Sequence, residues 1–168
     1  MRFTPKGNFV KPLMISIFFT VASVVSLLFA SRLSQFRWLM QLLFLCFATT
    51  AIQFFMKYVL TSYEYNCSEG NLLIYKSIGS KKVLLASVPL KYSESMLLPL
   101  KDFENSKGNY VFSETYVYTQ NYRTEDVYCY VTNAISKGAL IKIECDKEFA
   151  EHINLAIEAE KKGNECDE

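Results

Sequence analysis

The residues that could carry out catalytic chemistry are few and lie apart from one another along the chain. His152 is the only histidine, and it follows Glu151 rather than a nucleophile. The acidic clusters Glu125-Asp126 and Glu158–Glu160 have no histidine or nucleophile beside them, and no glycine-rich phosphate loop, G-x-S-x-G elbow or H-E-x-x-H motif occurs. Because catalysis needs such groups side by side, the sequence predicts a protein that is not an enzyme, with no catalytic or cofactor site.

The cysteines are the other residues that could form bonds or bind a metal. Their number is odd, one of them lies inside a long apolar run, and no C-x-x-C pair occurs. An odd and unclustered set is typical of free thiols in a reducing compartment rather than of a disulfide framework. With a single histidine, it also predicts no zinc or other metal site. The five cysteines are Cys46, Cys67, Cys129, Cys145 and Cys166.

Three lysines form the first candidate binding site. Lys76, Lys81 and Lys82 lie in or beside a turn expected at residues 79–82. Such a cluster could approach an anionic lipid surface, at about 1 kcal/mol for each basic residue near the charged head groups. The alternative is a solvated turn that binds nothing.

Four tyrosines form the second candidate site, as a face for a protein partner. Tyr116 and Tyr118 lie on one expected strand, and Tyr128 and Tyr130 lie on the next. Residues two apart on a strand share a face, and tyrosine is enriched in protein interfaces. The alternative is ordinary packing in the core and on the sheet surface.

Two apolar runs, Leu13–Ala30 and Trp38–Met56, organise the rest of the chain. Neither contains a charged residue, and at about 1.5 Å per residue each is long enough to cross a hydrocarbon core. A helix is the only single segment that satisfies its own backbone in lipid. The sequence therefore predicts a transmembrane hairpin within residues 1–61, with helices at about 12–30 and 38–60.

Each predicted membrane helix carries small and polar residues on one face. Small residues allow helices to pack closely in lipid, so the two faces are expected to meet inside the hairpin, with a dimerisation face as the alternative. The residues are Ser16, Thr20, Ser23, Ser26 and Ala30 on the first helix and Cys46, Thr49, Thr50 and Gln53 on the second.

Charge is distributed unevenly along the chain. Residues 1–60 hold six basic residues and no acid, whereas residues 61–168 hold twelve basic and seventeen acidic residues, a net charge of −5. This balance argues against a nucleic-acid binder. The N-terminal tail has three basic residues and Lys57 follows the second run, against Arg32 and Arg37 in the connecting loop. The bias predicts a multi-pass membrane protein with both termini in the cytoplasm.

Residues 62–168 are expected to form one cytosolic domain. Alternating apolar residues between turn signals predict six or seven half-buried antiparallel strands, a loop at 102–110 and a C-terminal helix at about 147–162 with Asp146 as its N-cap. The expected strands are 62–67, 72–78, 83–88, 92–98, 111–119, 126–135 and 139–145.

This element order, ending with strand 139–145 running into Phe149, resembles a pleckstrin-homology-like (PH-like) domain. With the membrane hairpin, the chain resembles small bacterial membrane proteins that carry such a domain. The resemblance implies a bent antiparallel sheet that forms a partly open barrel capped by the C-terminal helix. It also implies that turns at the open end can hold basic residues for phosphorylated head groups.

Together these features predict an integral membrane protein that is not an enzyme. Its cytosolic PH-like domain is expected to bind or scaffold another protein, or to self-associate. The alternative is a sensor of anionic membrane lipid that uses the basic turn after the second strand.

Overall fold

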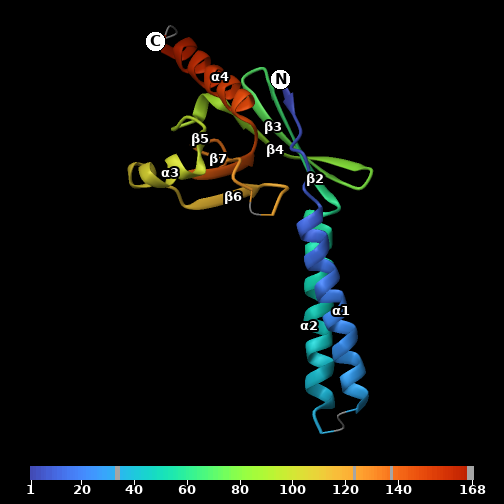
Figure 1. The fold of residues 1–168 in the computed structure, drawn as a ribbon. Coiled ribbons are helices and arrows are strands. Elements are labelled where there is room, and N and C mark those ends of the chain that lie inside the picture. The colour runs from blue at the N-terminus through green and yellow to red at the C-terminus, as the bar shows by residue number, and fades with distance from the viewer. Residues whose placement is uncertain (33–34, 123, 137, 166–168) are drawn as a thin grey trace. The chain divides into compact units, whose positions relative to one another are not determined.

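The computed structural model describes residues 1–32, 35–122, 124–136 and 138–165, and the chain divides into two compact units (Figure 1). The helical hairpin comprises Gly7–Thr61, and the β unit comprises Met1–Lys6 together with Ser62–Glu168. The chain thus leaves the β unit after six residues and returns to it only after both long helices.

The hairpin consists of α1 (Val10–Arg32) and α2 (Arg37–Tyr58), which confirms the two predicted long apolar helices. The buried residues of α1 include Ser16, Ser23, Ser26 and Ala30, so four of the five residues of the predicted small-residue face pack against α2. The fifth, Thr20, is exposed. Ser16 Oγ donates a hydrogen bond to the carbonyl of Ala51 at 3.2 Å. Small side chains let the two backbones approach closely.

The prediction for α2 is wrong, because its polar face does not meet α1. Cys46, Thr49 and Gln53 are exposed on the opposite side of the helix. Aromatic rings of the two helices also meet, since Phe19 of α1 lies 6.1 Å from Phe47 of α2 between ring centroids. The α2 residues shielded along this seam include Leu43, Phe44, Phe47, Ala48 and Ala51.

The first sheet has the strand order β1-β2-β3-β4 and joins chain segments from either side of the hairpin. Its strands are β1 (Arg2–Phe3), β2 (Thr61–Ser68), β3 (Asn71–Ile78) and β4 (Lys81–Pro89). β1 pairs antiparallel with β2, Arg2 opposite Asn66 and Phe3 opposite Tyr65. The N-terminal tail was expected to carry only charge, because two residues are too few to show an alternating pattern.

Two-residue turns connect β2 to β3 and β3 to β4. Glu69 and Gly70 both have positive φ, as a type I′ turn requires. Gly79 has φ +59 at the first position of the next turn, which suits a type II′ turn. The predicted turn at 79–82 is therefore shorter than expected, since Lys81 and Lys82 already belong to β4.

The second sheet has the order β5-β7-β8-β6 and includes a parallel pair, β6 with β8. The prediction of purely antiparallel strands is therefore wrong. The strands are β5 (Leu98–Pro99), β6 (Glu114–Tyr118), β7 (Val127–Thr132) and β8 (Ala139–Glu144).

Gly138 explains why β6 can start beside β8. Its φ is +66, and its carbonyl accepts a hydrogen bond from the Ser113 amide at 2.8 Å. A Cβ at this position would meet the Val111 carbonyl oxygen at 2.3 Å, so only glycine admits the segment that leads into β6.

The region around the two prolines differs most from expectation. The expected strand 92–98 is replaced by η1 (Leu90–Tyr92), an isolated bridge at Ser93 and the two-residue β5. The expected loop 102–110 holds α3 (Leu100–Ser106) and η2 (Lys107–Asn109). Burial of Phe103 holds α3 in place, although the surrounding sequence is polar.

The core of the β unit has two parts, one on each face of the second sheet. The larger contains Leu72, Ile74, Tyr130, Ile141, Ile143 and the buried side of the C-terminal helix. The smaller contains Phe103, Val127, Cys129, Val131 and Leu140. β7 and β8 are thus buried on both faces rather than half-buried. The described residues form eight strands in two open sheets and no closed barrel, where one bent sheet forming a partly open barrel was expected.

The C-terminal helix α4 (Lys147–Glu165) confirms the predicted helix and extends it through Gly163. The Asp146 carboxylate accepts the Phe149 amide at 2.8 Å, which confirms the predicted N-cap. Phe149, Ile153 and Ile157 are fully buried along one stripe. This stripe covers the larger core.

Candidate functional site

The structure brings the three predicted lysines together at the end of one two-stranded ribbon, here called the β3–β4 tip (residues 76–85). Lys76 lies opposite Val83, and Ile78 lies opposite Lys81. Because paired residues share a face, Lys76 and Lys81 lie on one face of the ribbon and Lys82 on the other.

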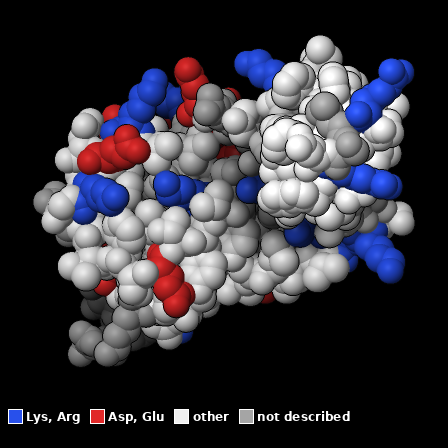
Figure 2. All heavy atoms as spheres, turned by 90° about the horizontal axis from the view of Figure 1, so that it is seen from below, with Lys and Arg blue, Asp and Glu red and all other residues white. Residues whose placement is uncertain are grey.

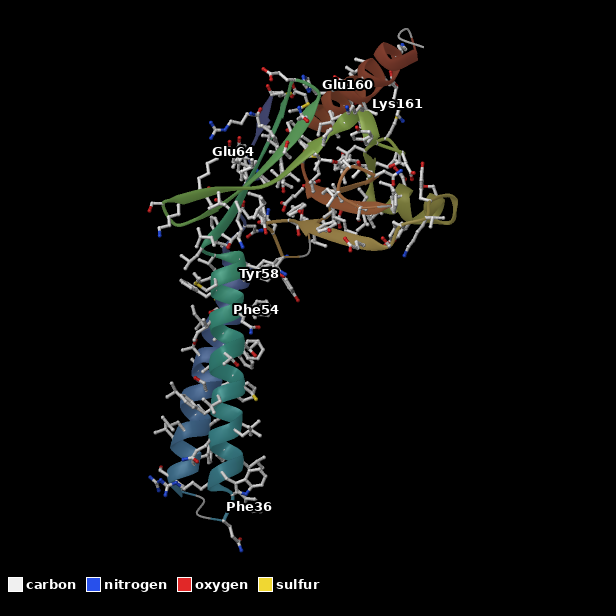
Figure 3. The ribbon with its side chains drawn as sticks, turned by 180° about the vertical axis from the view of Figure 1, so that it is seen from behind. Phe36, Phe54, Tyr58, Glu64, Glu160 and Lys161 are labelled. Atoms are coloured by element: carbon white, nitrogen blue, oxygen red, sulfur yellow. The ribbon has the colours of Figure 1, made fainter. Side chains whose placement is uncertain are left out.

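Lys82 is held by a small ion-pair network. Its centre is Glu64 of β2, which is labelled in Figure 3. The Glu64 carboxylate accepts hydrogen bonds from Lys82 at 2.7 Å and from Arg2 at 2.6 Å. Lys82 Nζ also lies 4.3 Å from the centroid of the Tyr75 ring. Lys76 and Lys81 make no ion pair with any residue that the structure describes.

The same network shifts the acidity of Glu64. Burial alone would raise the pKa of this carboxyl, but the hydrogen bonds and charges of Lys82 and Arg2 lower it below its usual value. Glu64 therefore remains ionised and fixes both cations on the sheet. Of the three lysines, Lys82 is the one already neutralised by an acid of this chain.

Exposed apolar side chains surround the lysines, which the sequence pattern did not reveal. Val83 is 58% exposed and Leu84 49%, with Ile78 and Leu85 also exposed. Since Val83 and Leu84 are consecutive, apolar side chains project from both faces of the ribbon. The unbroken run Val83-Leu84-Leu85, where a half-buried strand would alternate, was the available signal.

β4 also presents an unpaired backbone edge. It pairs with β3 on one side, and within the described ranges no strand pairs with its other side. A bulge between Ile74 and Tyr75 shifts the register and leaves Leu85 as the extra residue. A free edge beside exposed apolar side chains is a surface to which another strand can add.

The four predicted tyrosines do not form one outward face. Tyr130 is fully buried in the larger core, so it cannot belong to an exposed surface. Tyr118 and Tyr128 are half-buried against that core, and Tyr116 stacks on Tyr118 at 6.3 Å between centroids. β8 separates β6 from β7, so the two tyrosine pairs are not on neighbouring strands.

The buried carboxylate Glu144 is a structural group. It accepts the backbone amides of Gln120 at 3.1 Å and Asn121 at 2.9 Å, and the Asn121 side chain also binds it. The side-chain amide of Asn121 also donates a hydrogen bond to the Lys6 carbonyl at 2.9 Å. Glu144 thus fixes the segment after β6 and the end of the N-terminal tail. Within the described part of the chain, no three His, Cys, Asp or Glu residues cluster as metal ligands would.

The described cysteines are free thiols. Cys67, Cys129 and Cys145 are buried in the β unit and Cys46 is exposed on α2, while Cys166 lies outside the described residues. Burial raises the pKa of Cys129 to about 11, because the charged thiolate is poorly solvated there. These buried thiols are therefore not reactive nucleophiles.

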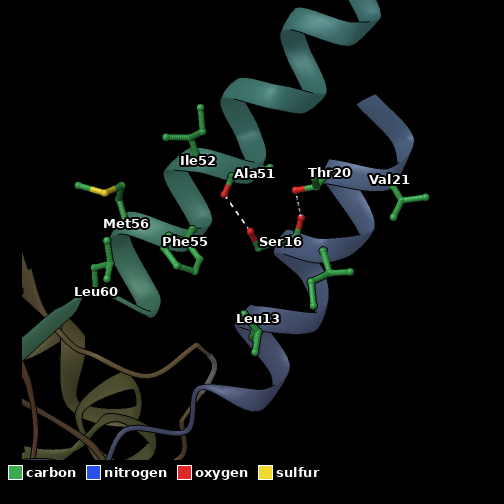
Figure 4. A pocket seen from close by; sticks show the side chains of 10 residues that line it. Leu13, Ser16, Thr20, Val21, Ala51, Ile52, Phe55, Met56 and Leu60 are labelled. Atoms are coloured by element: carbon green, nitrogen blue, oxygen red, sulfur yellow. Dashed lines mark hydrogen bonds between the residues drawn. The ribbon is translucent and has the colours of Figure 1, made fainter. Parts of the chain in front are cut away.

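The hairpin carries an apolar groove between its helices (Figure 4). Its polar groups are already satisfied, since Thr20 Oγ1 donates to the Ser16 carbonyl at 2.9 Å and Ser16 to Ala51. The groove offers a polar ligand no free donor and suits a hydrocarbon chain. The lining residues are Leu13, Ser16, Ile17, Thr20, Val21, Ala51, Ile52, Phe55, Met56 and Leu60.

Comparisons with known proteins identified no relative of this chain. The chain matches no protein-family model, no curated protein and no solved structure.

Proposed function

We propose that this protein is a membrane-anchored binding module that is not an enzyme, with α1 and α2 spanning a bacterial inner membrane. Both helices are long and apolar enough to cross a bilayer. Side chains such as Phe18, Leu28 and Trp38 are exposed along them. In the end-on view of Figure 2 the surface of the hairpin is mainly uncharged, with basic side chains around its edge. Apolar surface on this scale is stable against lipid rather than water.

The pairing of β1 with β2 supports an orientation with both termini on one side. The two strands lie on either side of the hairpin in sequence and share a sheet, so both ends of the hairpin face the same compartment. Lys6, Lys11 and Lys57 flank this end, whereas Arg32 and Arg37 flank the other. The small excess of basic residues favours the cytoplasm for the β unit.

The PH-like resemblance remains a proposal for the β unit. Two sheets followed by a C-terminal helix support it, while the parallel pair β6–β8 and the added α3 depart from it. The resemblance concerns the architecture of the domain and does not identify a ligand.

We infer that the β unit binds a protein segment at the β3–β4 tip, by strand addition to β4. The observation that carries this proposal is the free β4 edge flanked by exposed Val83 and Leu84. Lysines and a bulge on an edge strand disfavour indiscriminate pairing. Residues 71–89 contain three lysines and no acid. The fitting partner is therefore an extended segment in which apolar and acidic residues alternate.

A charge-swap selection tests this inference. The full chain, held in nanodiscs of neutral phosphatidylcholine, would select ten-residue peptides from a displayed random library. We expect alternating apolar and acidic peptides, and Lys81→Glu with Lys82→Glu should shift the selection to basic peptides. The matched control, Lys101→Glu with Lys161→Glu, should leave the selection unchanged. The proposal fails if no peptide is enriched, or if both variants select the wild-type peptides.

A lipid-reading role is the second candidate, favoured by apolar side chains on both faces of a basic ribbon end. Against this role, the β unit as a whole contains fourteen basic and seventeen acidic residues, a balance that opposes an anionic surface.

Hydrogen exchange separates the two candidates. If the tip reads lipid, the amides of residues 78–85 should exchange more slowly in nanodiscs with anionic phosphatidylglycerol than in neutral ones. Lys81→Glu with Lys82→Glu and added salt should remove that difference. Equal exchange in both lipids rules out the lipid role and leaves the protein partner.

A further inference from the structure

Gln53 is the polar side chain on the outer face of α2 that the structure leaves unsatisfied. The neighbouring hydroxyls bond within the helix, Thr49 to the Leu45 carbonyl and Thr50 to the Cys46 carbonyl, each at 2.8 Å. The side chain of Gln53 is exposed, and its carboxamide makes no hydrogen bond with any described residue. In hydrocarbon, such a carboxamide would leave two donors and an acceptor unpaired.

The direction of the helix keeps Gln53 away from water. Gln53 lies five residues before the end of α2 at Tyr58, about 7.5 Å along the axis. Cα–Cβ bonds tilt toward the N-terminus of a helix, so Gln53 leans toward the middle of the span. Gln41, near the start of α2, leans toward its own nearby end instead.

Gln53 belongs to a regular row of exposed residues, here called the outer stripe: Leu42, Cys46, Thr49, Gln53 and Met56. The intervals are four, three, four and three residues. This is the heptad spacing by which two helices pack along a left-handed seam. α1 occupies the opposite side of α2, where Phe47 and Ala51 are shielded. Met56, at the end of the stripe, also lines the rim of the groove between the two helices.

We propose that a second copy of this chain covers the outer stripe, with two α2 helices packed in parallel and their Gln53 carboxamides hydrogen-bonded to each other. A carboxamide both donates and accepts, so it is complementary to itself across a two-fold axis. A second copy inserted in the same direction presents Gln53 at the same depth. Lipid tails offer no such partner, and Cys46 and Thr49 are small enough for close approach.

This inference rests on the proposed membrane insertion, and it deepens the proposed function. A dimer would present two β3–β4 tips on one membrane face. A partner with two matching segments would then bind with a higher effective affinity than a single tip allows.

Disulfide mapping in native membranes tests the dimer. In the first chain, Cys166→Ser leaves Cys46 as the exposed cysteine to be oxidised. In a second series, which carries both Cys46→Ser and Cys166→Ser, one new cysteine replaces Leu42, Thr49 or Gln53. Leu45→Cys and Ile52→Cys are matched controls, because both positions are exposed but lie off the stripe. We expect a band of twice 19.3 kDa, at least fivefold stronger on the stripe than off it. Equal yields at all positions, no dimer band, or a band that contains another protein would overturn the proposal.

Substitution of Gln53 adds a second readout. Interhelical hydrogen bonds in membranes are modest, so Gln53→Leu should weaken dimerisation in micelles by about three- to tenfold, measured by energy transfer between labelled chains. Gln53→Asn retains the carboxamide and should stay close to wild type. Equal dimerisation of all three proteins would contradict the role given to Gln53.

An alkaline carbonate wash distinguishes failure of the dimer from failure of the proposed membrane insertion. A chain that stays in the membrane but forms no stripe disulfide refutes the dimer alone. A chain that the wash releases refutes membrane insertion, and the dimer with it.

Discussion

The helical hairpin and the β unit place their large apolar side chains in opposite positions. In the β unit the large residues, such as Tyr130 and Phe149, are inside. In the hairpin, the buried face of α1 consists of serines, an alanine and a proline, while rings and leucines point outward. The first arrangement gains its stability from removing apolar surface from water. The second gains little in that way and depends on close packing of the small α1 residues against α2.

The largest expected contrast comes from removing one phenylalanine ring from each unit. Phe149→Ala should lower the free energy of unfolding of the β unit by about 3–5 kcal/mol, because the ring is fully buried. Phe29→Ala removes a ring from an exposed position of α1. This substitution should change the free energy of unfolding of the hairpin by less than about 0.5 kcal/mol. Urea unfolding of the full chain in micelles measures both, and equal losses would remove the contrast.

The N-terminal tail tests where the β unit begins. Phe3 lies 5.4 Å from Phe149 and 6.5 Å from Tyr65 between ring centroids. Phe3→Ala should therefore destabilise the β unit by about 2–3 kcal/mol in the same urea experiment. Phe9→Ala removes the same ring just before α1 and serves as the control, since Phe9 is exposed. A Phe3→Ala chain as stable as the control would argue that β1 adds nothing to the sheet.

The seam of the hairpin should respond to added volume rather than to lost volume. Ser23 is buried between the helices, so Ser23→Leu should separate them and destabilise the hairpin by about 1–2 kcal/mol. Val24→Leu, one position along on the exposed side, should have almost no effect. Thermal loss of helical circular dichroism in micelles checks the pair. If both variants melt alike, the seam does not depend on small residues.

The smallest expected effect concerns the ion pairs at Glu64. Its pKa is lowered in the folded chain, so its contribution is present above the unfolded pKa of about 4.3 and is lost as the pH falls through the folded value. Glu64→Gln should flatten the decline in stability between about pH 5 and pH 3. The difference should stay below about 1 kcal/mol, because Arg2 and Lys82 are largely solvated. Urea midpoints across this range provide the measurement, and a steeper decline in the variant would contradict the sign.

Long periodic segments explain what could be predicted from the sequence. The apolar runs and the stripe Phe149, Ile153 and Ile157 identify α1, α2 and α4, and the glycines at 70 and 79 mark the two turns of the first sheet. Each of these signals is local, so neighbouring residues suffice to read it.

The features that were missed depend on contacts between distant residues. The strand β1 has two residues and is recognisable only through its partner Tyr65. The parallel pair β6–β8 depends on Gly138 admitting Val111, and α3 depends on a single buried ring. In the candidate site, the lysines were visible in the sequence. The unbroken apolar run Val83-Leu84-Leu85 was the signal that β4 is not a half-buried strand, but its position at the edge of the sheet depends on distant strands.

The pairing of β1 with β2 also sets an order of events during synthesis. Phe3 and its partner Tyr65 are separated by 61 intervening residues, which include both long helices. At about 5–20 residues per second, the ribosome needs about 3–12 s to synthesise these intervening residues, and β1 has no strand partner during that time. The first sheet therefore closes only after the whole hairpin has been synthesised, and a complete chain in which β1 fails to dock is left with β2 as an open sheet edge.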